Sequence, residues 1–251
     1  MTSARRGASD PVDGHPSPAP EPSSPGHPSS RPPVSRSSST DVPTTVHLVR
    51  HGEVFNPEKV LYGRLPGFVL SEAGQRQAKV TAEFLAGRDI AAVVASPLER
   101  ARQTAAPIAQ ALGIGVEVDP RLIESRNVFE GKPFEAGPAL LRYPRMWRVL
   151  INPFRPSWGE PYTEIAGRML AAVAEWRDAF PGREVVLVSH QLPVWTARRA
   201  LEGQKLWHRP DRRQCALASV TSAVYSADRL LRIDYAEPNG PTTNQPGSVG
   251  A

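Results

Sequence analysis

The sequence has few of the features that mark disulfide-bonded, membrane-spanning or metal-cluster proteins. It contains one cysteine, Cys215, which excludes an intrachain disulfide and any cysteine-cluster metal site. No apolar run approaches the length of about 18 residues that a transmembrane helix needs. No apolar stretch of about 7–15 residues follows Arg5 and Arg6, as a secretory signal requires. We therefore expect a cytoplasmic protein with no membrane partner.

Signals for nucleic-acid binding are also absent. The net charge is +5 over 251 residues, but no basic helix and no aromatic–basic repeat is present. A moderate positive charge fits small anionic substrates instead. One basic stretch, Trp-His-Arg-Pro-Asp-Arg-Arg at 207–213, has two interpretations that stay open. It could hold a second anionic group of a substrate, or it could be an ordinary solvated loop.

The two ends of the chain lack the apolar residues that a folded core needs. Residues 1–43 are dominated by Pro, Ser, Gly and small polar residues, which cannot bury enough apolar surface to offset the entropy of ordering. We predict a disordered Pro/Ser-rich tail there and a flexible, Gly/Pro-rich tail at 238–251. Residues 44–237 remain, roughly 200 residues, which is the size of one α/β domain.

Apolar strands alternate with amphipathic helices in this domain, which predicts a single three-layer α/β/α domain with a mostly parallel sheet. The predicted strands are 46–50, 90–95, 116–118, 185–190, 216–225 and 230–235. Helices are predicted at 71–87, from 97 onward, and at 162–180 and 193–201. Ser71 and Ser96 are the expected N-caps, and Pro107 should kink or interrupt the second helix. Residues 125–160, rich in Pro, Arg and aromatics, predict an irregular helical insertion or lid.

Two of the predicted strands stop at a histidine. Residues 46–52 read Val-His-Leu-Val-Arg-His-Gly, and residues 185–190 read Val-Val-Leu-Val-Ser-His. Ligands of open α/β sheets bind outside the carboxyl ends of the strands, so His51 and His190 can face each other across one crevice. Arg50, directly before His51, indicates that the ligand is an anion.

These residue types suit phosphoryl transfer. A neutral imidazole is a competent nucleophile toward phosphorus. Arginines bind phosphate oxygens and lower the pKa of a neighbouring histidine, which keeps the imidazole neutral. Arg100 follows the strand at 90–95 near a helix N-terminus, where free backbone N–H groups also favour phosphate.

A leaving alkoxide needs a proton donor. Glu124 leaves the third predicted strand in the same layer, and a carboxyl group near a bound phosphate dianion has its pKa raised. From spacing alone, Glu124 is equally well interpreted as an ordinary surface carboxylate. Glu130 is the competing candidate for the proton donor.

Four motifs, in order, resemble those of the histidine phosphatase superfamily, which includes cofactor-dependent phosphoglycerate mutases and many small-molecule phosphatases. They are Leu-Val-Arg-His-Gly-Glu at 48–53, Ser-Pro-Leu-Glu-Arg-Ala-Arg-Gln-Thr-Ala at 96–105, Leu-Ile-Glu at 122–124 and Val-Ser-His at 188–190. The resemblance covers about residues 45–236 and implies a phosphoglycerate mutase-like fold. Residues 70–78 also match the start of the family's first helix, and Gly159-Glu160 followed by Arg168 resembles a later helix start.

The resemblance also implies roles for individual residues. His51 would be the phosphorylated nucleophile and Glu124 the proton donor. No metal and no organic cofactor is implied. The residues expected to complete the phosphate pocket are Arg50, Arg100, His190 and Asn56.

The chain departs from the family pattern mainly on the substrate side. Asn56 lies one residue closer to His51 than is usual, and Gln191 stands where the family commonly has glycine after the second histidine. The Gln191 amide could contact substrate or narrow the pocket. The segment Asn-Val-Phe-Glu-Gly at 127–131 is one residue shorter than the family's acid loop. We therefore expect conserved chemistry with an unusual substrate.

The sequence thus predicts a metal-independent phosphatase that hydrolyses a small phosphate ester through a phosphohistidine on His51. Its partner is a small phosphorylated substrate and not a nucleic acid. Two alternatives remain at this point: a phosphoglycerate mutase-type phosphotransferase, and a catalytically silent phosphate-binding member of the family.

Overall fold

The structure is a computed structural model that describes residues 42–131 and 159–241. Its strands are β1 Thr44–Arg50, β2 Ile90–Ala95, β3 Val116–Val118, β4 Glu184–Ser189, β5 Val220–Ser226 and β6 Arg229–Ala236. Its helices are α1 Glu72–Leu85, α2 Glu99–Leu112, α4 Tyr162–Ala179 and α5 Gln191–Leu201, with the 3-10 turns η1 Pro120–Leu122 and η3 Pro210–Arg212.

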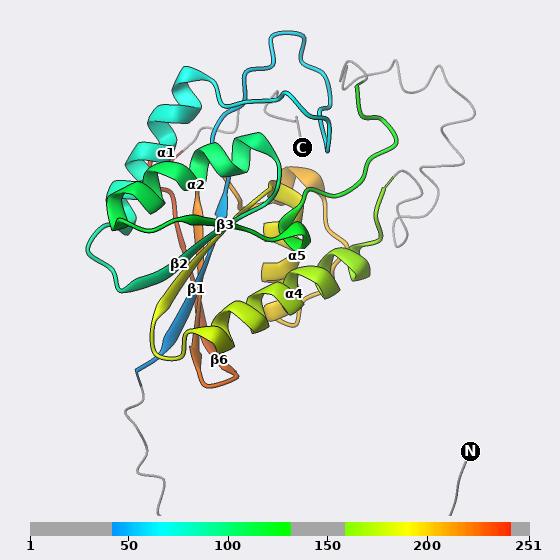
Figure 1. The fold of residues 1–251 in the computed structure, drawn as a ribbon. Helices are drawn as coiled ribbons and strands as arrows, with labels where there is room; N and C mark the ends of the chain where they lie inside the picture. The colour runs from blue at the N-terminus through cyan, green and yellow to red at the C-terminus, as the bar shows by residue number, and fades with distance from the viewer. Residues whose placement is uncertain (1–41, 132–158, 242–251) are drawn as a thin grey trace, which may run out of the picture. The chain divides into compact units, whose positions relative to one another are not determined.

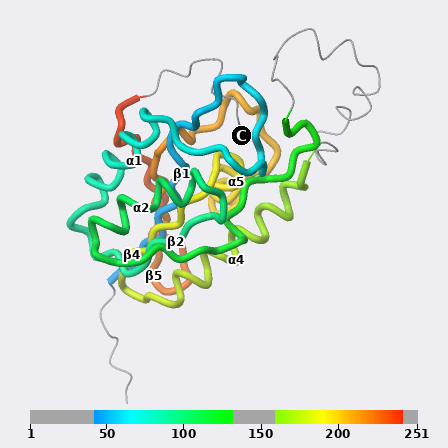
Figure 2. Tube along the Cα trace, turned by 45° about the horizontal axis from the view of Figure 1, so that its top comes forward, coloured from blue at the N-terminus to red at the C-terminus, as the bar shows by residue number. Residues whose placement is uncertain are grey.

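The strands form one six-stranded sheet in the order β3-β2-β4-β1-β5-β6. The strands β3, β2, β4 and β1 run parallel, whereas β5 and β6 add an antiparallel edge. Helices α1 and α2 cover one face of the sheet, and α4 and α5 cover the other (Figures 1 and 2). The three-layer α/β fold that the sequence predicted is confirmed.

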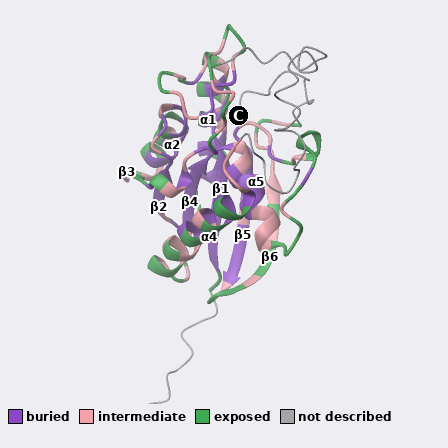
Figure 3. Ribbon diagram, turned by 90° about the vertical axis from the view of Figure 1, so that its right-hand side faces the viewer, coloured by how far each residue is buried: buried purple, intermediate pink, exposed green. Residues whose placement is uncertain are grey.

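Strand β1 is buried on both faces because helices cover both of them. Val46 and Leu48 pack in a cluster with α4 and α5, and Val49 packs in a second cluster with α1 and α2. Figure 3 shows the result as a buried sheet between helices whose outer sides are exposed. Two packed layers hold the carboxyl ends of β1, β2 and β4 in fixed relative positions.

Helix α1 begins as predicted, with Ser71 as its N-cap and the Ser71 Oγ accepting from the Gly74 N–H at 3.0 Å. Helix α2 differs from the prediction in two ways. It begins at Glu99 after Leu98, not after Ser96, and it runs through Pro107 without interruption. Proline removes one helical hydrogen bond. Here the apolar face of α2 packs on the sheet on both sides of Pro107, and this burial keeps the helix continuous.

The predicted terminal tails lie outside the described residues, except for 42–43 and 238–241, and so does most of the predicted insertion, at 132–158. The described ends of that insertion meet. Asn127 and Gly159 form an isolated antiparallel bridge, and the Glu160 N–H donates to the Arg126 carbonyl at 3.1 Å. The chain therefore leaves and returns close to Glu124. In the ranges that the structure describes, no helix is both long and apolar enough to cross a membrane.

One buried polar bridge crosses three strands of the sheet. His47 of β1 is fully buried, with its Nδ1 2.8 Å from the Ser222 hydroxyl of β5 and its Nε2 2.7 Å from the Glu184 carboxylate of β4. The hydrogen bond from His47 is the main cause that lowers the pKa of Glu184. A buried polar group is tolerated when its partners are in place, so this bridge fixes β1 against both neighbours.

Replacement of His47 by leucine should therefore weaken the fold. His47→Leu leaves Ser222 without this partner and leaves Glu184 only its longer contact with Arg88 at 3.5 Å, and we expect the free energy of unfolding to fall by about 1–3 kcal/mol. Urea unfolding at neutral pH measures this loss. Because the folded-state pKa of Glu184 is lowered, the bond stabilises the fold above the usual carboxyl value near 4.5 and is lost as the pH falls through the lowered pKa. The two proteins should thus converge in acid. The control Arg183→Gln, which breaks only an exposed pair with Asp89, should show no comparable loss.

Candidate active site

The register of β1 and β4 brings the two histidines together. Arg50 pairs with Ser189 across these parallel strands, so His51 and His190 each stand one residue beyond the paired ends. The His51 N–H donates to the Ser189 carbonyl at 3.0 Å, and the two ring centroids are 5.1 Å apart. Both side chains are fully buried.

The hydrogen bonds of His51 define its tautomer. Nδ1 lies 2.7 Å from the Gly52 carbonyl oxygen, which can only accept, so Nδ1 carries the hydrogen. Nε2 keeps its lone pair and has no partner among the described residues. Burial lowers the pKa of His51 well below 6.5, and the charges of Arg100 and Arg50 lower it further. His51 is therefore a neutral imidazole with a free lone pair.

Glycine at position 52 is required by close packing of the loop after β1. A Cβ at Gly52 would lie 2.7 Å from the carbonyl oxygen of Gly74, at the start of α1. The Gly52 N–H donates to the Thr104 hydroxyl of α2 at 3.1 Å. The loop that carries His51 is thus fixed against two helices.

Two arginines next to His51 keep unused donors. Arg100 is fully buried in the first turn of α2, where its Nη2 donates to the Gly63 carbonyl at 2.6 Å and its guanidinium lies 4.7 Å from the ring centre of Tyr62. Its Nε and Nη1 have no partner among the described residues. Arg50 donates through Nη1 to the Cys215 carbonyl at 2.7 Å and keeps a free Nε. Buried donors without partners are costly, and an anion bound between them would satisfy these groups.

His190 is held by Ser96, which the sequence predicted to be the N-cap of the second helix. Its Nε2 lies 2.8 Å from the Ser96 hydroxyl, and its Nδ1 has no partner among the described residues. The prediction that Ser96 caps α2 is wrong, because the N-cap is Leu98, although the Ser96 hydroxyl also accepts from the Leu98 N–H at 3.4 Å. With Ser96 as donor to Nε2, Nδ1 carries a hydrogen that can reach a ligand. Burial, followed by the charge of Arg100, lowers the pKa of His190 well below its usual value.

Glu124 follows η1 and is only 1% exposed. Its Oε1 accepts from the Ser125 N–H at 2.7 Å, and its Oε2 has no partner among the described residues. Burial raises the pKa of Glu124, although the charges of Arg100, Arg213 and Arg168 oppose that shift. A carboxyl group that keeps its proton can act as a general acid.

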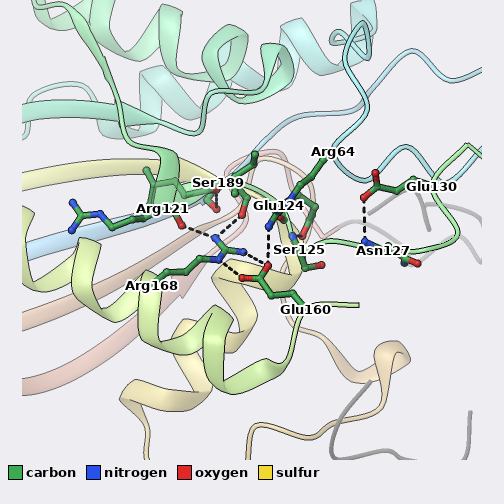
Figure 4. A network of polar contacts seen from close by, with 11 residues as sticks. Arg64, Arg121, Glu124, Ser125, Asn127, Glu130, Glu160, Arg168 and Ser189 are labelled. Atoms are coloured by element: carbon green, nitrogen blue, oxygen red, sulfur yellow. Dashed lines mark hydrogen bonds and ion pairs between the residues drawn. The ribbon is translucent and has the colours of Figure 1, made fainter. Parts of the chain in front are cut away.

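The main chain around Glu124 is held by ion-paired arginines (Figure 4). Arg168 Nη1 donates to the carbonyls of residues 121 and 123, the latter at 2.6 Å, and Arg64 Nε donates to the Glu124 carbonyl at 2.6 Å. Glu160 bridges the two arginines at 2.8 Å from each. The Gly159-Glu160…Arg168 pattern in the sequence thus fixes the backbone of Glu124.

The competing Glu130 has a different environment. It is half-buried, and its Oε1 accepts from the Asn127 N–H at 3.2 Å, within its own turn (Figure 4). Asn56 forms hydrogen bonds within its own loop. Its side-chain amide donates to the Val60 carbonyl at 2.8 Å and accepts from the Val60 N–H at 3.1 Å. A phosphate contact by Asn56 stays a prediction.

Several residues near the histidines carry no recognisable sequence signal, or only a weak one. Tyr62, 5% exposed, faces Arg100 and lies in a segment with no motif. Arg213 belongs to the basic stretch at 207–213, and its Nη1 donates to the Gln191 Oε1 at 3.3 Å. Gln191 is the first residue of α5 and is half-buried.

Across the described ranges, no group of three or more His, Cys, Asp or Glu residues is arranged to hold a metal ion.

Fold and site together define a class: an α/β protein that gathers two buried, neutral histidines and two buried arginines with unused donors at the carboxyl ends of its parallel strands. Residues 46–235 match the family model described as histidine phosphatase superfamily, branch 1, and the chain belongs to this superfamily. It is 59% identical over 195 residues to the uncharacterized protein Rv0525 of Mycobacterium tuberculosis, covering 78% of this chain and 96% of that protein.

Solved structures agree with the family assignment. The mycobacterial glucosyl-3-phosphoglycerate phosphatase Rv2419c superposes with a TM-score of 0.63 at 27% identity, over 77% of this chain and 97% of that one. A phosphoglycerate mutase from Bacillus anthracis, at 20% identity, has a TM-score of 0.59 over 76% and 92% of the two chains and supports the fold alone. The resemblance inferred from the sequence is confirmed, and the protein is of the phosphatase or mutase type.

The unpaired donors of Arg100 should dominate anion binding. Arg100→Gln removes a buried charge and should weaken binding of inorganic phosphate or vanadate by on the order of 10–100-fold. Arg102→Gln is the matched control, because Arg102 lies in the same helix turn but is exposed. Titration calorimetry on both variants tests the assignment, and equal effects of the two substitutions would contradict it.

Proposed function

We propose that the protein is a metal-independent phosphatase that hydrolyses a small phosphate monoester through a phosphohistidine on His51. One observation carries the proposal: the unpartnered Nε2 of a buried, neutral His51 lies among the unused donors of Arg50, Arg100 and His190. A nucleophile and a set of anion donors are thus gathered at one end of the sheet.

In the first step, the donors bind the phosphate oxygens and the Nε2 lone pair attacks phosphorus. The N–P bond forms as the bond from phosphorus to the ester oxygen breaks, and the arginines stabilise charge on the equatorial oxygens. Glu124 transfers its proton from Oε2 to the leaving oxygen, which departs as an alcohol. The first step leaves a phosphohistidine and an ionised Glu124.

In the second step, water replaces the alcohol. The Glu124 carboxylate takes one proton from the attacking water, the new O–P bond forms, and the N–P bond breaks. Inorganic phosphate leaves, the electron pair returns to Nε2, and Glu124 is protonated again. The cycle balances without a redox partner.

The nucleophile is tested by phosphate release from a panel of small esters, including an aryl phosphate, with EDTA present. We expect turnover by the wild type and a loss of at least about 1000-fold in His51→Ala. Retained vanadate binding by the variant would show that its pocket is folded. Phosphate exchange between substrates with little release to water would indicate a mutase instead, and anion binding without turnover would indicate a silent binding protein.

The proton donor is tested by pH dependence. Because the pKa of His51 is lowered, activity should persist below pH 6.5. Because the pKa of Glu124 is raised above 4.5 and its acid form is required, the rate on an alkyl ester should fall as the pH rises through that pKa.

Glu124→Gln should abolish this alkaline limb and lower the rate on the alkyl ester by about 100–10,000-fold. The loss should be smaller on an aryl ester, whose leaving group needs less protonation. Glu130→Gln is the matched control and should keep the wild-type profile. A larger effect of Glu130→Gln would transfer the role of proton donor to that residue.

A further inference from the structure

One cationic side chain beside the site has no role in the proposed phosphoryl transfer. Arg213 follows η3 in the loop before β5 and is half-buried, whereas Arg209 and Arg212 of the same stretch are exposed. Arg209 also forms an ion pair with Asp211 at 2.9 Å. Arg213 forms no ion pair with any carboxylate in the described part of the chain.

Two neutral acceptors hold the Arg213 guanidinium in place. Its Nε donates to the His208 Nε2 at 2.9 Å, and its Nη1 donates to the Gln191 Oε1 at 3.3 Å. His208 is oriented by its Nδ1, which lies 2.7 Å from the Leu206 carbonyl and therefore carries the hydrogen. Burial lowers the pKa of His208 to about 4, so its Nε2 remains an acceptor at neutral pH. The guanidinium is fixed without being neutralised, and its Nη2 has no partner among the described residues.

The groups whose pKa the Arg213 charge shifts indicate where Arg213 lies. The Arg213 charge lowers the pKa of Glu124, and Arg213 and Arg50 repel one another. Arg213 therefore lies within electrostatic reach of both the proton donor and the phosphate pocket. In the proposed reaction Glu124 faces the leaving oxygen, so Arg213 lies on the leaving-group side. A desolvated cation without a counter-ion is unfavourable, and an anion arriving there would relieve that cost.

We propose that Arg213, held by Gln191 and His208, forms a second anion subsite that binds a carboxylate or a second phosphate on the leaving group of the substrate. The substrate class is then a phosphate monoester of an alcohol that itself carries negative charge. This inference rests on the proposed function for its orientation. It also gives Gln191 a physical role, because a glycine at that position would offer no side-chain acceptor.

The test compares pairs of compounds that differ by one anionic group. One pair is 3-phosphoglycerate and glycerol 3-phosphate, which tests a carboxylate, and the other is fructose 1,6-bisphosphate and fructose 6-phosphate, which tests a second phosphate. Dissociation constants are measured by calorimetry in a His51→Ala background, where no turnover occurs. The same pairs are compared by kcat/KM with His51 intact.

We expect the more highly charged member of at least one pair to bind about tenfold or more tightly, and Arg213→Gln to remove most of that preference. Arg212→Gln, an adjacent and exposed arginine with the same change of charge, should preserve the preference. The pair that responds identifies the carboxylate or the phosphate as the second group. Gln191→Ala should reduce the preference by about two- to tenfold, and it carries the test if Arg213→Gln does not fold.

Three results would overturn the subsite. They are no preference in the parent protein, a preference that survives in Arg213→Gln, and an equal loss for both members of a pair. The last result would place Arg213 on the transferred phosphate. The two proposals can be contradicted separately. Discrimination in binding without phosphate release would contradict the proposed phosphatase activity and leave the proposed subsite in place.

Discussion

Burial of positive charge without a permanent counter-ion is the constraint on which the site depends. Arg50 and Arg100 are 2% and 0% exposed, and each bonds to a main-chain carbonyl, which satisfies a donor but does not neutralise the cation. The face of Tyr62 adds a favourable contact for Arg100. Both histidines are neutral because of their own burial and of these charges. The proposed nucleophile and the proposed anion site therefore have one physical origin, and the sheet between two helical layers holds these buried groups in place.

Glu124, the proposed proton donor, shows the opposite balance between burial and charge. The surrounding arginines favour an ionised Glu124, yet burial is the larger effect and raises its pKa. The pKa of Glu124 stays raised only while its carboxyl group remains buried. Arg168 and Arg64 secure it through main-chain carbonyls, and the Glu160 carboxylate forms ion pairs with both arginines. The arginines close to Glu124 thus hold its main chain in place, while burial keeps the pKa of its carboxyl group raised.

The sequence predicted the parts of this site that local patterns control. An apolar strand ending at a histidine is a local signal, and the pairing of two such strands follows from parallel α/β architecture. Ser96 was misassigned, and the interruption predicted as one outcome at Pro107 does not occur. Capping and helix-breaking tendencies are local, whereas the outcomes depended on His190 and on packing of α2 against the sheet. Tyr62 and the orientation of Arg213 could not be predicted, since their partners are distant in the chain or lie on loops without motifs.

The proposed subsite links recognition to chemistry. The proposed phosphate contacts come from strand ends and the first turn of α2, which packing fixes, whereas Gln191 and Arg213 come from a helix start and a loop. Arg213 lowers the pKa of Glu124 in the free protein. An anion bound to Arg213 would cancel that charge, so the pKa of Glu124 would rise when the leaving group carries a negative charge. A substrate of the proposed class would then increase the protonated fraction of its own general acid, and a neutral ester would not. Selectivity would appear in the catalytic step as well as in binding, because the same ion pair that anchors the leaving group prepares its protonation.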